Sequence, residues 1–543
     1  MRKFFGFLLI IFLLIQSTIV CGDITIPKTV KVGLNYGNPM FDNINIKSNK
    51  PIELVLSKSG EEETISLKSP IDFSFRKDSY YNILDGGTKK IQYIKAVKYS
   101  GELIGPFHIR IGNTYKDYNS ADTALKSMGK SIKGLFIAYE NGWQIWNGLL
   151  LDEKECKEQI DIIQNKIPDA KLQIIGPDEK RIQITDADGN PFFVYNCNEI
   201  FIKAPNAEKE LSLISFNGAN YRGELIIKTL EDGSIGVINS LPLDQYLYGV
   251  VPCEMEPTWH TEALKAQAVA ARNYALQNIC KHEKEGYNLC STQHCQVYKG
   301  YDKENPKTNE AIDQTKGKLL YYNNELAQTY YHSSSGGHTE NSESIWSETI
   351  PYLRGVDDSY GLGSPYDLWI SELDKSHIES KLSEYSMNIG NLVDIRPIEL
   401  SKFGRVTQLE IIGTKDTIIL EKEKFRTMFG TSNIKSIWYE VNTESDINVF
   451  DMQQNANIMK RPNGLSVVSA DSKRTLTQND KSLYIKGPYD IKKLNVLPSS
   501  YTFKGKGWGH GIGMSQYGAK GMAESGFNYV KILEHYYKGT AVR

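Results

Sequence analysis

The sequence lacks a charge excess, a dense set of cysteines and, beyond its first residues, any long apolar run. Its 63 Lys and Arg nearly balance 65 Asp and Glu, which leaves a formal net charge of −2. Nucleic acid is therefore not an expected partner, because no basic field is available to bind it. Seven cysteines in 543 residues, odd in number and irregularly spaced, exclude a disulfide-dense scaffold. After the N-terminal run, no apolar stretch is long enough to cross a bilayer.

The N-terminus carries an export signal. Arg2 and Lys3 precede an apolar run of about 17 residues, FFGFLLIIFLLIQSTIV, at the lower edge of a membrane span. Residues 1–22 are therefore predicted to be a signal peptide or an uncleaved N-terminal membrane anchor. Cys21 resembles a lipoprotein site, but Val20 stands where a small residue is expected. We expect an exported protein whose bulk lies outside the cytoplasmic membrane.

Length and patterning indicate a multidomain α+β protein. Residues 24–105 alternate apolar and polar residues between Gly, Asn and Asp turns, which predicts a β-rich module. Residues 106–177 indicate the order strand, helix, strand, strand, helix, strand, with helices from near Ser120 and over Glu153–Ile167. The second helix places Cys156 on the same side as Ile160 and Ile163, so Cys156 is predicted to be a core thiol.

The segment 106–177 also resembles the sporulation-related repeat (SPOR) domain. The resemblance rests on the order of elements and on the GPF and GxW-like punctuation, and it covers about 70 residues. It implies binding of septal glycan that has been stripped of its peptides. An unrelated small α+β module is the alternative.

The stretch Asp244–Ala275 combines an apolar segment, two glutamates and an alanine-rich helix. DQYLYGVVP predicts a strand or a buried turn that ends at Pro252. TEALKAQAVAARNYALQN, from Thr261, predicts a helix. Glu254 and Glu256 lie between the two, where a carboxylate can be held by both elements and still face a groove. An ordinary solvated acidic loop is the alternative.

The predicted helix has a small-residue stripe and a polar side. Leu264, Ala268, Ala271 and Ala275 form the stripe, along which another backbone can approach closely. Lys265 and Arg272 lie on an adjacent face two turns apart, and Gln267 lies roughly opposite Lys265. The two cations could bind an anionic or polyhydroxylated ligand, or set the ionisation of a nearby carboxylate. A solvated basic face is the alternative.

Two glycine-containing motifs follow at a distance. YYHSSSGGHTENSESIW spans Tyr330–Trp346, and FKGKGWGHGIGMSQYGAKGMAESG lies near the C-terminus. Glycine lets the backbone approach a ligand without a Cβ in the way. A nucleotide site is rejected, because no dinucleotide fold surrounds the GxGxxG-like spacing and the acidic ribose partner is missing. A loop that lines a groove fits the composition instead.

In combination, YLYGVVPCEMEPTWHTEALKAQAVAARNYAL and the two later motifs closely resemble the stage II sporulation protein D family, from about Leu241 to Arg543. That family includes spore-engulfment lytic transglycosylases and the related amidase enhancers. The resemblance implies a catalytic domain over residues 180–543 that cleaves peptidoglycan between N-acetylmuramic acid and N-acetylglucosamine, with no cofactor for catalysis. It also implies a place in the cell wall or at the outer face of the membrane, such as a spore or forespore envelope.

The resemblance assigns roles residue by residue. The catalytic glutamate falls on Glu254. The substrate-binding residues fall on Lys265, Gln267, Arg272, Ser335, Gly336, Gly337, Thr339, Glu340, His510, Gly511, Gly513, Ser515 and Gln516, with Gly518 in the same motif. His338 departs from the family, where arginine is frequent.

A single acid suffices for a lytic transglycosylase, because the muramic hydroxyl replaces water as the nucleophile. Hydrolysis would need a second carboxylate, for which Glu256 and Glu340 are the candidates. One alternative is a non-catalytic, glycan-binding enhancer of an N-acetylmuramoyl-L-alanine amidase, which would then be the partner. Another is a structural wall-binding protein whose SPOR-like segment does the main work.

The region CKHEKEGYNLCSTQHCQVY supplies residue types that suit zinc. His282, Cys290, His294 and Cys295 are the candidate ligands of a structural ion, and relatives of the family carry Cys and His here as a metal site. The spacing is not that of a standard zinc finger, and only a loop could direct both His294 and Cys295 to one ion. A Cys290–Cys295 disulfide is the alternative.

Overall fold

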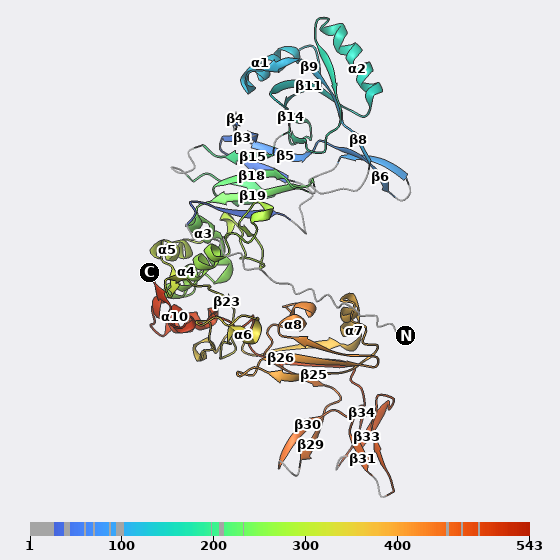
Figure 1. Ribbon diagram of the computed structural model, residues 1–543, viewed down its shortest axis with the longest axis vertical. Helices are drawn as coiled ribbons and strands as arrows, with labels where there is room; N and C mark the ends of the chain where they lie inside the picture. The colour runs from blue at the N-terminus through green and yellow to red at the C-terminus, as the bar shows by residue number, and fades with distance from the viewer. Residues whose placement is uncertain are drawn as a thin grey trace, which may run out of the picture. The chain divides into compact units, whose positions relative to one another are not determined.

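The computed structural model (Figure 1) describes residues 26–36, 44–58, 61–68, 71–85, 88–93, 102–196, 198–205, 211–231, 233–451, 455–468, 471–486 and 489–543. The predicted signal peptide or anchor at 1–22 lies outside these residues. Within them, no helix combines the length and the apolar character that a membrane span requires. The chain divides into two compact units: one holds the residues up to Cys253 with Ala275–Glu304, and the other holds Glu254–Tyr274 with Asn305–Arg543.

Two large sheets and a small one form the first unit. One has the strand order β20 (Leu289–Cys290), β1 (Val30–Asn35), β19 (Ile235–Leu241), β18 (Glu224–Thr229), β15 (Glu199–Lys203), β3 (Ile52–Lys58), β4 (Glu61–Leu67). The other has the order β12 (Leu172–Ile175), β9 (Phe107–Tyr115), β11 (Trp143–Leu150), β10 (Leu135–Tyr139), β14 (Pro191–Tyr195), β13 (Ile182–Thr185), β5 (Ile71–Lys77), β2 (Ile44–Ser48), β16 (Ile214–Phe216), β17 (Ala219–Tyr221). The small sheet holds β7 (Thr88–Tyr93), β6 (Tyr80–Asp85) and β8 (Glu102–Gly105).

The strand pairing crosses the predicted module boundaries. β1 pairs with β19, with Val30 opposite Leu241, and β3 pairs with β15, with Val55 opposite Phe201. Strands β1–β5 of the 24–105 segment thus share their sheets with strands from beyond residue 180, whereas β6, β7 and β8 of the same segment form the small sheet by themselves. An alternating pattern identifies a strand and its buried face, but it does not identify the partner strand. The mixed, multidomain α+β character itself is confirmed.

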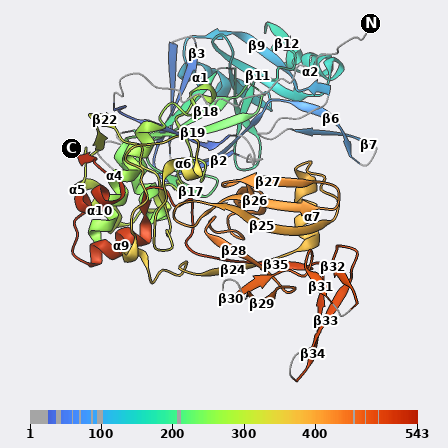
Figure 2. The same cartoon turned by 60° about the horizontal axis from the view of Figure 1, so that its bottom comes forward.

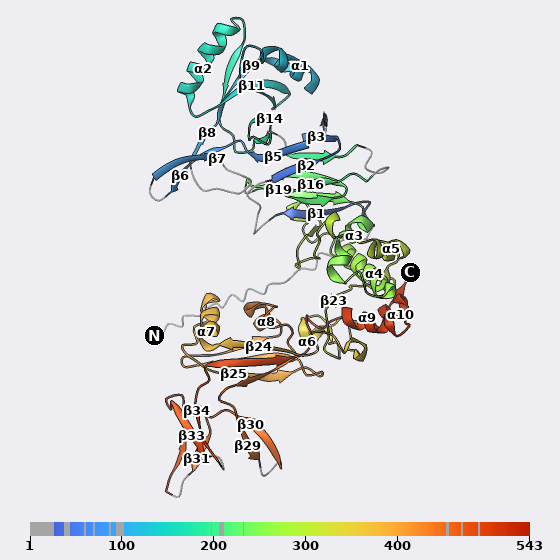
Figure 3. The same ribbon diagram turned by 180° about the vertical axis from the view of Figure 1, so that it is seen from behind.

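The segment 106–177 contains β9, α1 (Tyr118–Met128), β10, β11, α2 (Glu153–Lys166) and β12, in the predicted order. The helices lie beside β9 and β11 (Figures 1 and 3). Asp117 and Asp152 cap them by accepting the N–H groups of Ser120 and Glu155. Cys156 is fully buried, and burial raises the pKa of its thiol to about 11, as expected of a core thiol.

The prediction of a strand before Pro252 was wrong, because Leu243–Glu254 forms a helix, α3. Leu243, Tyr246, Leu247 and Val250 recur at helical spacing, and all are buried. Pro252 lies in the last turn, so the distortion that proline imposes falls where the helix ends. Glu254 is the last residue of α3 and the first residue of the second unit.

The helix α4 (Thr261–Gln277) is surrounded by protein on nearly every side. Its apolar residues, including Leu264 and Val269, belong to the main core of the second unit. The polar side that was expected to face a groove is also buried, since Gln267 is 0% and Arg272 is 2% exposed. Because alanine side chains are small, other elements can pack against an alanine-rich helix on all sides. The stripe of small residues in the sequence indicated close packing on one side only.

The remaining elements of the second unit surround α4 or form a sheet region that bears extended hairpins. Around α4 lie α5 (Pro306–Gln314), β21 (Leu320–Tyr322), β22 (Glu325–Leu326), β23 (Tyr331–His332), α6 (Ser342–Ile345), β36 (Met514–Ser515), α9 (Gln516–Glu524), α10 (Tyr529–Tyr536) and β37 (Ala541–Val542). The sheet region holds β24 (Trp369–Asp374), α7 (Lys375–Glu384), β25 (Leu392–Leu400), β26 (Val406–Gly413), β27 (Thr417–Glu421), α8 (Lys424–Phe429), β28 (Tyr439–Thr443) and β35 (Ser500–Gly505). Figure 2 shows three hairpins that project from this region and lie between β28 and β35 in the chain. They are β29–β30 (Ile447–Asp451 and Ala456–Lys460), β31–β32 (Ser466–Val468 and Lys473–Thr475) and β33–β34 (Ser482–Lys486 and Ile491–Asn495).

Candidate active site and metal centre

The two glycine-containing motifs, far apart in the sequence, pack directly against each other. β23 pairs in parallel with β36, and Ser334 forms a bridge with Trp508. Gly336 has φ +77°, and a Cβ there would lie 2.7 Å from the Cβ of Lys506. A Cβ at Gly507 would lie 2.6 Å from the carbonyl oxygen of Ser334. Glycine is therefore required at both positions, because the two loops touch through their backbones.

Glu254 is joined to the C-terminal motif by one hydrogen bond. The Gln516 side chain donates from Nε2 to Glu254 Oε2 over 3.1 Å. Gln516 is the first residue of α9, and Ser515 caps this helix by accepting the N–H of Gly518 at 3.1 Å. Glu254 as a residue is neither fully buried nor fully exposed. The site thus lies where α3 ends, at Glu254, and where α9 begins, at Gln516.

A buried carboxylate that the sequence did not reveal organises the glycine loops. Asp358 is fully buried and accepts hydrogen bonds from Ser335 Oγ and from Tyr536 Oη, each at 2.5 Å. Burial raises the pKa of Asp358, against hydrogen bonds that lower it. A Cβ at Gly518 would lie 1.9 Å from Asp358 Oδ1, so the helix backbone approaches the carboxylate closely. No motif marked Asp358, because its partners come from three separate segments.

A second unforeseen residue, Arg405, is buried between the two motifs. Its guanidinium donates to the carbonyl oxygens of Ser335 at 3.0 Å and His338 at 2.8 Å. Glu340 is also buried, and its Oε2 lies 3.9 Å from Arg405 Nε and accepts from Ser401 Oγ at 2.5 Å. Burial lowers the pKa of Arg405 to about 10, which leaves it charged at neutral pH. Arg405 and Glu340 therefore brace the loops from inside.

The structure brings the predicted substrate-binding residues together, but it buries most of them. Nine are buried and face the protein: Gln267, Arg272, Ser335, Gly336, Thr339, Glu340, Gly511, Gly513 and Ser515. Four lie near the surface or contact Glu254: Lys265, Gly337, His510 and Gln516. For the first group, direct contact with glycan stays a prediction; in this structure these residues lie among protein groups rather than at the surface.

Two of the three predicted helix residues, Lys265 and Arg272, illustrate this difference. Arg272 donates to the carbonyl oxygens of Ile312 and Lys318, each at 3.4 Å, around the end of α5. Lys265 forms an ion pair with Glu262 at 2.7 Å, and Glu262 in turn accepts the N–H of Tyr529. Both cations are thus engaged with the protein itself rather than displayed as a basic face.

His510 lies in an aromatic setting within the C-terminal motif. Its ring centre is 5.2 Å from that of Trp346 and 5.4 Å from that of His332. Burial, together with the charges of Arg426 and Arg405, lowers the pKa of His510 to about 3. The imidazole is therefore neutral at physiological pH, and it accepts the N–H of Ile512 at its Nδ1.

A row of half-buried aromatic rings continues from Gln516. Tyr517, the next residue, stands 4.9 Å from the ring of Trp259 and 5.9 Å from that of Tyr366. Tyr366 lies 4.5 Å from Trp508 of the C-terminal motif. Lys520 and Lys435 lie over the two outer rings, at 5.6 Å from Trp259 and 5.2 Å from Trp508. We name these four rings the aromatic row.

In the first unit, the four candidate metal ligands converge. The nearest donor atoms of His282, Cys290, His294 and Cys295 all lie within 4.8 Å of one another. Cys295 Sγ is 3.4 Å from His282 Nε2, and Cys290 Sγ is 3.7 Å from His294 Nδ1. Tetrahedral zinc with bonds of about 2.0–2.3 Å requires ligand separations of about 3.3–3.8 Å. These two pairs lie in that range, and the more distant pairs of the set would have to move closer to bind the same ion. The turn at Thr292–Cys295 directs His294 and Cys295 to one side. The thiols of Cys290 and Cys295 are not joined in a disulfide.

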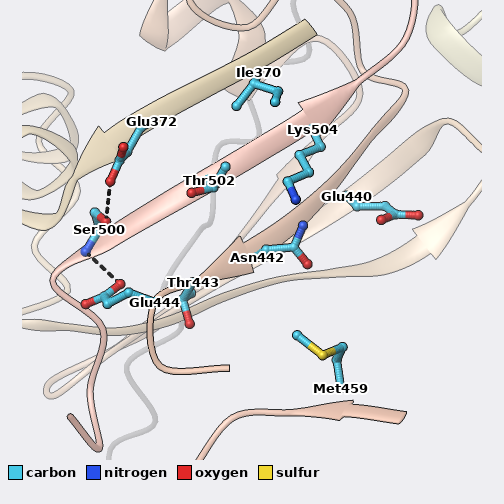
Figure 4. Close-up of a pocket in the computed structure, with 10 residues that line it drawn as sticks. All are labelled: Ile370, Glu372, Glu440, Asn442, Thr443, Glu444, Met459, Ser500, Thr502 and Lys504. Carbon is cyan, nitrogen blue, oxygen red and sulfur yellow. Dashed lines mark hydrogen bonds between the residues drawn. The ribbon is translucent and has the colours of Figure 1, made fainter. Parts of the chain in front are cut away.

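An open pocket lies elsewhere in the second unit (Figure 4). Its lining comes from β24, β28 and β35 with Met459, and its volume is about 610 Å³. Ser500 connects two of its carboxylates, since Ser500 Oγ donates to Glu372 and the Ser500 N–H points to Glu444. None of the predicted site residues lines this pocket.

Comparison with known proteins agrees with the motifs. The family described as Stage II sporulation protein matches residues 231–322, and a domain family of unknown function matches residues 364–457. The chain is 30% identical over 329 residues to an uncharacterized protein of Brachyspira hyodysenteriae, covering 60% of this chain and 73% of that protein. It is 27% identical over 323 residues to the stage II sporulation protein D of Bacillus subtilis, covering 56% and 75%. The chain belongs to the stage II sporulation protein D family.

A further member of this family is similar over a smaller share of its length. The amidase enhancer of Bacillus subtilis is 34% identical over 303 residues, which are 54% of this chain and 40% of that protein. The chain therefore spans less than half of this curated relative. The match to the family at 231–322 covers Glu254 and all four candidate metal ligands.

Proposed function

We propose that the protein remodels the bacterial cell wall as a lytic transglycosylase, with Glu254 as its acid and base. The observation that carries the proposal is the hydrogen bond from Gln516 to the carboxyl of Glu254, a half-buried residue at the end of α3. Glu254 would protonate the glycosidic oxygen between N-acetylmuramic acid and N-acetylglucosamine. It would then take the proton from the muramic hydroxyl, which attacks to give an anhydro-sugar end. Gln516 would fix the orientation of the carboxyl through both steps.

The surroundings of Glu254 favour a single-acid reaction over hydrolysis. Of the two candidates for a second carboxylate, Glu340 is fully buried and is committed to Ser401 and the N–H of Asn341. It cannot reach a water molecule on the opposite face of a sugar, as hydrolysis by inversion requires. Glu256 is exposed and two residues from Glu254, so it is the remaining candidate that an experiment must exclude.

The aromatic row supports glycan as the substrate class. Pyranose rings present C–H faces that pack against aromatic side chains, and a binding site needs such apolar walls beside a few polar groups. Trp259, Tyr517, Tyr366 and Trp508 are half-buried, and they continue from the residue that holds Glu254. The lysines at the two ends of the row are placed to meet anionic or hydroxyl groups of a bound strand.

Digestion of purified glycan strands tests the catalytic role. The wild-type protein is expected to release soluble fragments, and Glu254→Gln, which keeps the size of the side chain, is expected to lose at least a hundredfold of this rate. Glu256→Gln is the matched control and should retain most of the rate. Equal loss in both variants would assign the reaction to a pair of carboxylates, and full activity in Glu254→Gln would refute the proposal.

An amidase enhancer is the second candidate, favoured by the 34% identity to the Bacillus subtilis protein of that name. In that case the chain would bind glycan, leave it intact and raise the rate of a wall amidase. Adding the wild-type protein to a purified N-acetylmuramoyl-L-alanine amidase and intact wall would then accelerate peptide release. The Glu254→Gln variant would accelerate it equally, whereas the transglycosylase proposal predicts no such acceleration by that variant.

The segment 106–177 is proposed to bring the catalytic unit to its substrate, as its SPOR-like order of elements suggests. Its deletion is not a clean test, because β9–β12 are continuous with the strands of a larger sheet. Affinity for glycan lacking stem peptides, compared with intact wall, tests this role in the whole protein. A preference for the stripped glycan supports it, and equal binding contradicts it. The protein is further proposed to act outside the cytoplasmic membrane, at its outer face or in the wall.

We propose that His282, Cys290, His294 and Cys295 hold a structural zinc ion. Zinc would tie the turn at Thr292–Cys295 to the segment near His282, and it would play no part in the reaction at Glu254. Metal analysis of protein purified without added zinc should give about one equivalent, and Cys290→Ser should lower that content and the melting temperature. A stoichiometry near zero, with a Cys290–Cys295 disulfide in the mass spectrum, would contradict the proposal.

A further inference from the structure

The hairpins β31–β32 (Ser466–Val468 and Lys473–Thr475) and β33–β34 (Ser482–Lys486 and Ile491–Asn495) expose large apolar side chains. Val468 is 69%, Tyr484 67%, Ile491 65% and Tyr489 100% exposed. These hairpins project from the sheet region of the second unit in every view (Figures 1, 2 and 3). Single exposed apolar residues are ordinary, but a concentration of them marks an interaction surface.

Each of these apolar residues on a paired strand stands opposite a cation. The cross-strand partners are Val467 and Arg474, Val468 and Lys473, Tyr484 and Lys493, and Ile491 and Lys486. Directly opposed residues of an antiparallel pair lie on the same face. The Lys493 ammonium is in fact 6.0 Å from the ring centre of Tyr484. In β33–β34 the two pairs share one face, which alternates apolar and cationic side chains. In β31–β32 the two pairs are consecutive and point to opposite faces, and both faces are exposed.

The other face of β33–β34 accounts for the packing of this hairpin. Leu483 and Ile485 are half-buried there, and Leu494 is buried. The hairpin thus already has an inward apolar face, so Tyr484 and Ile491 are not needed for its core. An outward face is normally polar on such a hairpin, and its apolar members need a separate explanation.

The charge of this surface is opposite in sign to that of the chain. Residues 466–493 contain six cations, Lys473, Arg474, Lys481, Lys486, Lys492 and Lys493, against three aspartates, Asp471, Asp480 and Asp490. The whole chain has a net charge of −2. An anionic partner is therefore attracted to the hairpins more than to the rest of the protein.

We propose that the β31–β34 surface binds the face of an anionic phospholipid membrane. Lysine and arginine are attracted to anionic headgroups within a Debye length of the membrane. Tyrosine and aliphatic side chains beside them can enter the interfacial layer, while the lysine stems reach back to the headgroups. A soluble polyanion would use the cations alone and would leave Tyr484, Tyr489 and Ile491 in water. The surface is independent of the chemistry at Glu254.

Co-sedimentation of the full-length protein with lipid vesicles tests this proposal. One set of vesicles contains phosphatidylglycerol in phosphatidylcholine, and the other contains phosphatidylcholine alone. The first variant is Lys473→Glu with Lys486→Glu and Lys493→Glu, which stand opposite Val468, Ile491 and Tyr484. The second variant is Tyr484→Ser with Tyr489→Ser and Ile491→Ser. The control, Lys415→Glu with Lys424→Glu and Lys538→Glu, makes the same change of charge at exposed lysines off the hairpins. The apolar N-terminal run is common to all four proteins, so differences between them report the hairpins.

The wild-type and control proteins are expected to bind the anionic vesicles more tightly than the neutral ones. The charge-reversal variant should lose at least tenfold of this excess, and the serine variant should lose severalfold. Unchanged binding by the charge-reversal variant would overturn the proposal. Loss in that variant with none in the serine variant would also overturn it, because the surface would then recognise charge without entering a membrane. Unchanged melting temperature and glycan digestion would show that all variants are folded.

Discussion

Replacing the buried Arg405 tests whether the two glycine motifs are braced from inside. Arg405→Met keeps the length of the side chain but removes two charge-assisted hydrogen bonds, to Ser335 and His338. It also leaves Glu340, 3.9 Å away and fully buried, without its nearest cation. Bonds of this kind are worth about 1.5–3 kcal/mol each, and loss of one partner of a buried ion pair costs about 3–5 kcal/mol. Because the terms overlap, we expect a loss of about 4 kcal/mol in local stability.

Peptide-resolved hydrogen exchange is the appropriate assay, because a chain with two compact units has no single free energy of unfolding. In Arg405→Met, peptides that cover 334–340 and 505–513 should lose protection, while peptides from the first unit keep it. In Glu340→Gln the amide oxygen can still accept the N–H of Asn341, and the amide NH2 can donate to Ser401 Oγ, so the charge is removed while both contacts remain possible. The double variant should therefore be more stable than the sum of the single effects predicts. Protection equal to that of the wild type, or strictly additive effects, would refute the bracing role.

Two further predictions concern polar side chains of the second unit, His510 and Gln267. The pKa of His510 is lowered to about 3, whereas in the unfolded chain it is about 6.5. The unfolded state therefore binds the extra proton between these values, so stability is full above about pH 6.5 and falls as the pH drops toward 3. The stability then changes by up to about 1.4 kcal/mol per pH unit, and by about half of that for a partly exposed ring. Melting temperatures measured from pH 7 to 4 should therefore depend less on pH in His510→Gln than in the wild type. An equal pH dependence in the two proteins would contradict the lowered pKa of His510. The side-chain nitrogen and oxygen of the buried Gln267 have no hydrogen-bond partner among the described residues. Gln267→Leu removes this unsatisfied amide, so it should raise the melting temperature by the equivalent of about 1–3 kcal/mol. A lower melting temperature would show that the amide is hydrogen-bonded.

The sequence located the site better than it assigned roles within it. Glu254 and Gln516 were both foreseen, because three motifs in order carry the family resemblance, and the structure joins these two residues by a hydrogen bond. Arg272 and Glu340 were foreseen as ligand-binding groups, but they are buried and bind the protein itself. A motif cannot distinguish a polar residue that contacts substrate from one that supports a loop, because both are fixed by the same geometry.

The elements that sequence reasoning missed are those that depend on distant partners. Asp358 has no local signal, since Ser335 and Tyr536 reach it from separate segments. The pairing of β1 with β19 joins residues about 200 positions apart, which an alternating pattern cannot register. The helix α3, in contrast, did have a local signal in the sequence, since its apolar residues Leu243, Tyr246, Leu247 and Val250 recur at helical spacing. Pro252 and two β-branched valines favoured a strand instead, so the signal was missed.

We propose that Glu254 cleaves glycan with the muramic hydroxyl, and not water, as the nucleophile. Mass spectrometry of the fragment ends, after digestion of purified glycan strands by the wild-type protein, tests it most directly. We predict fragments that end in anhydro-muramic acid, and none from the Glu254→Gln variant under the same conditions. Reducing ends in the wild-type digest, or anhydro ends in equal amount from Glu254→Gln, would contradict the claim.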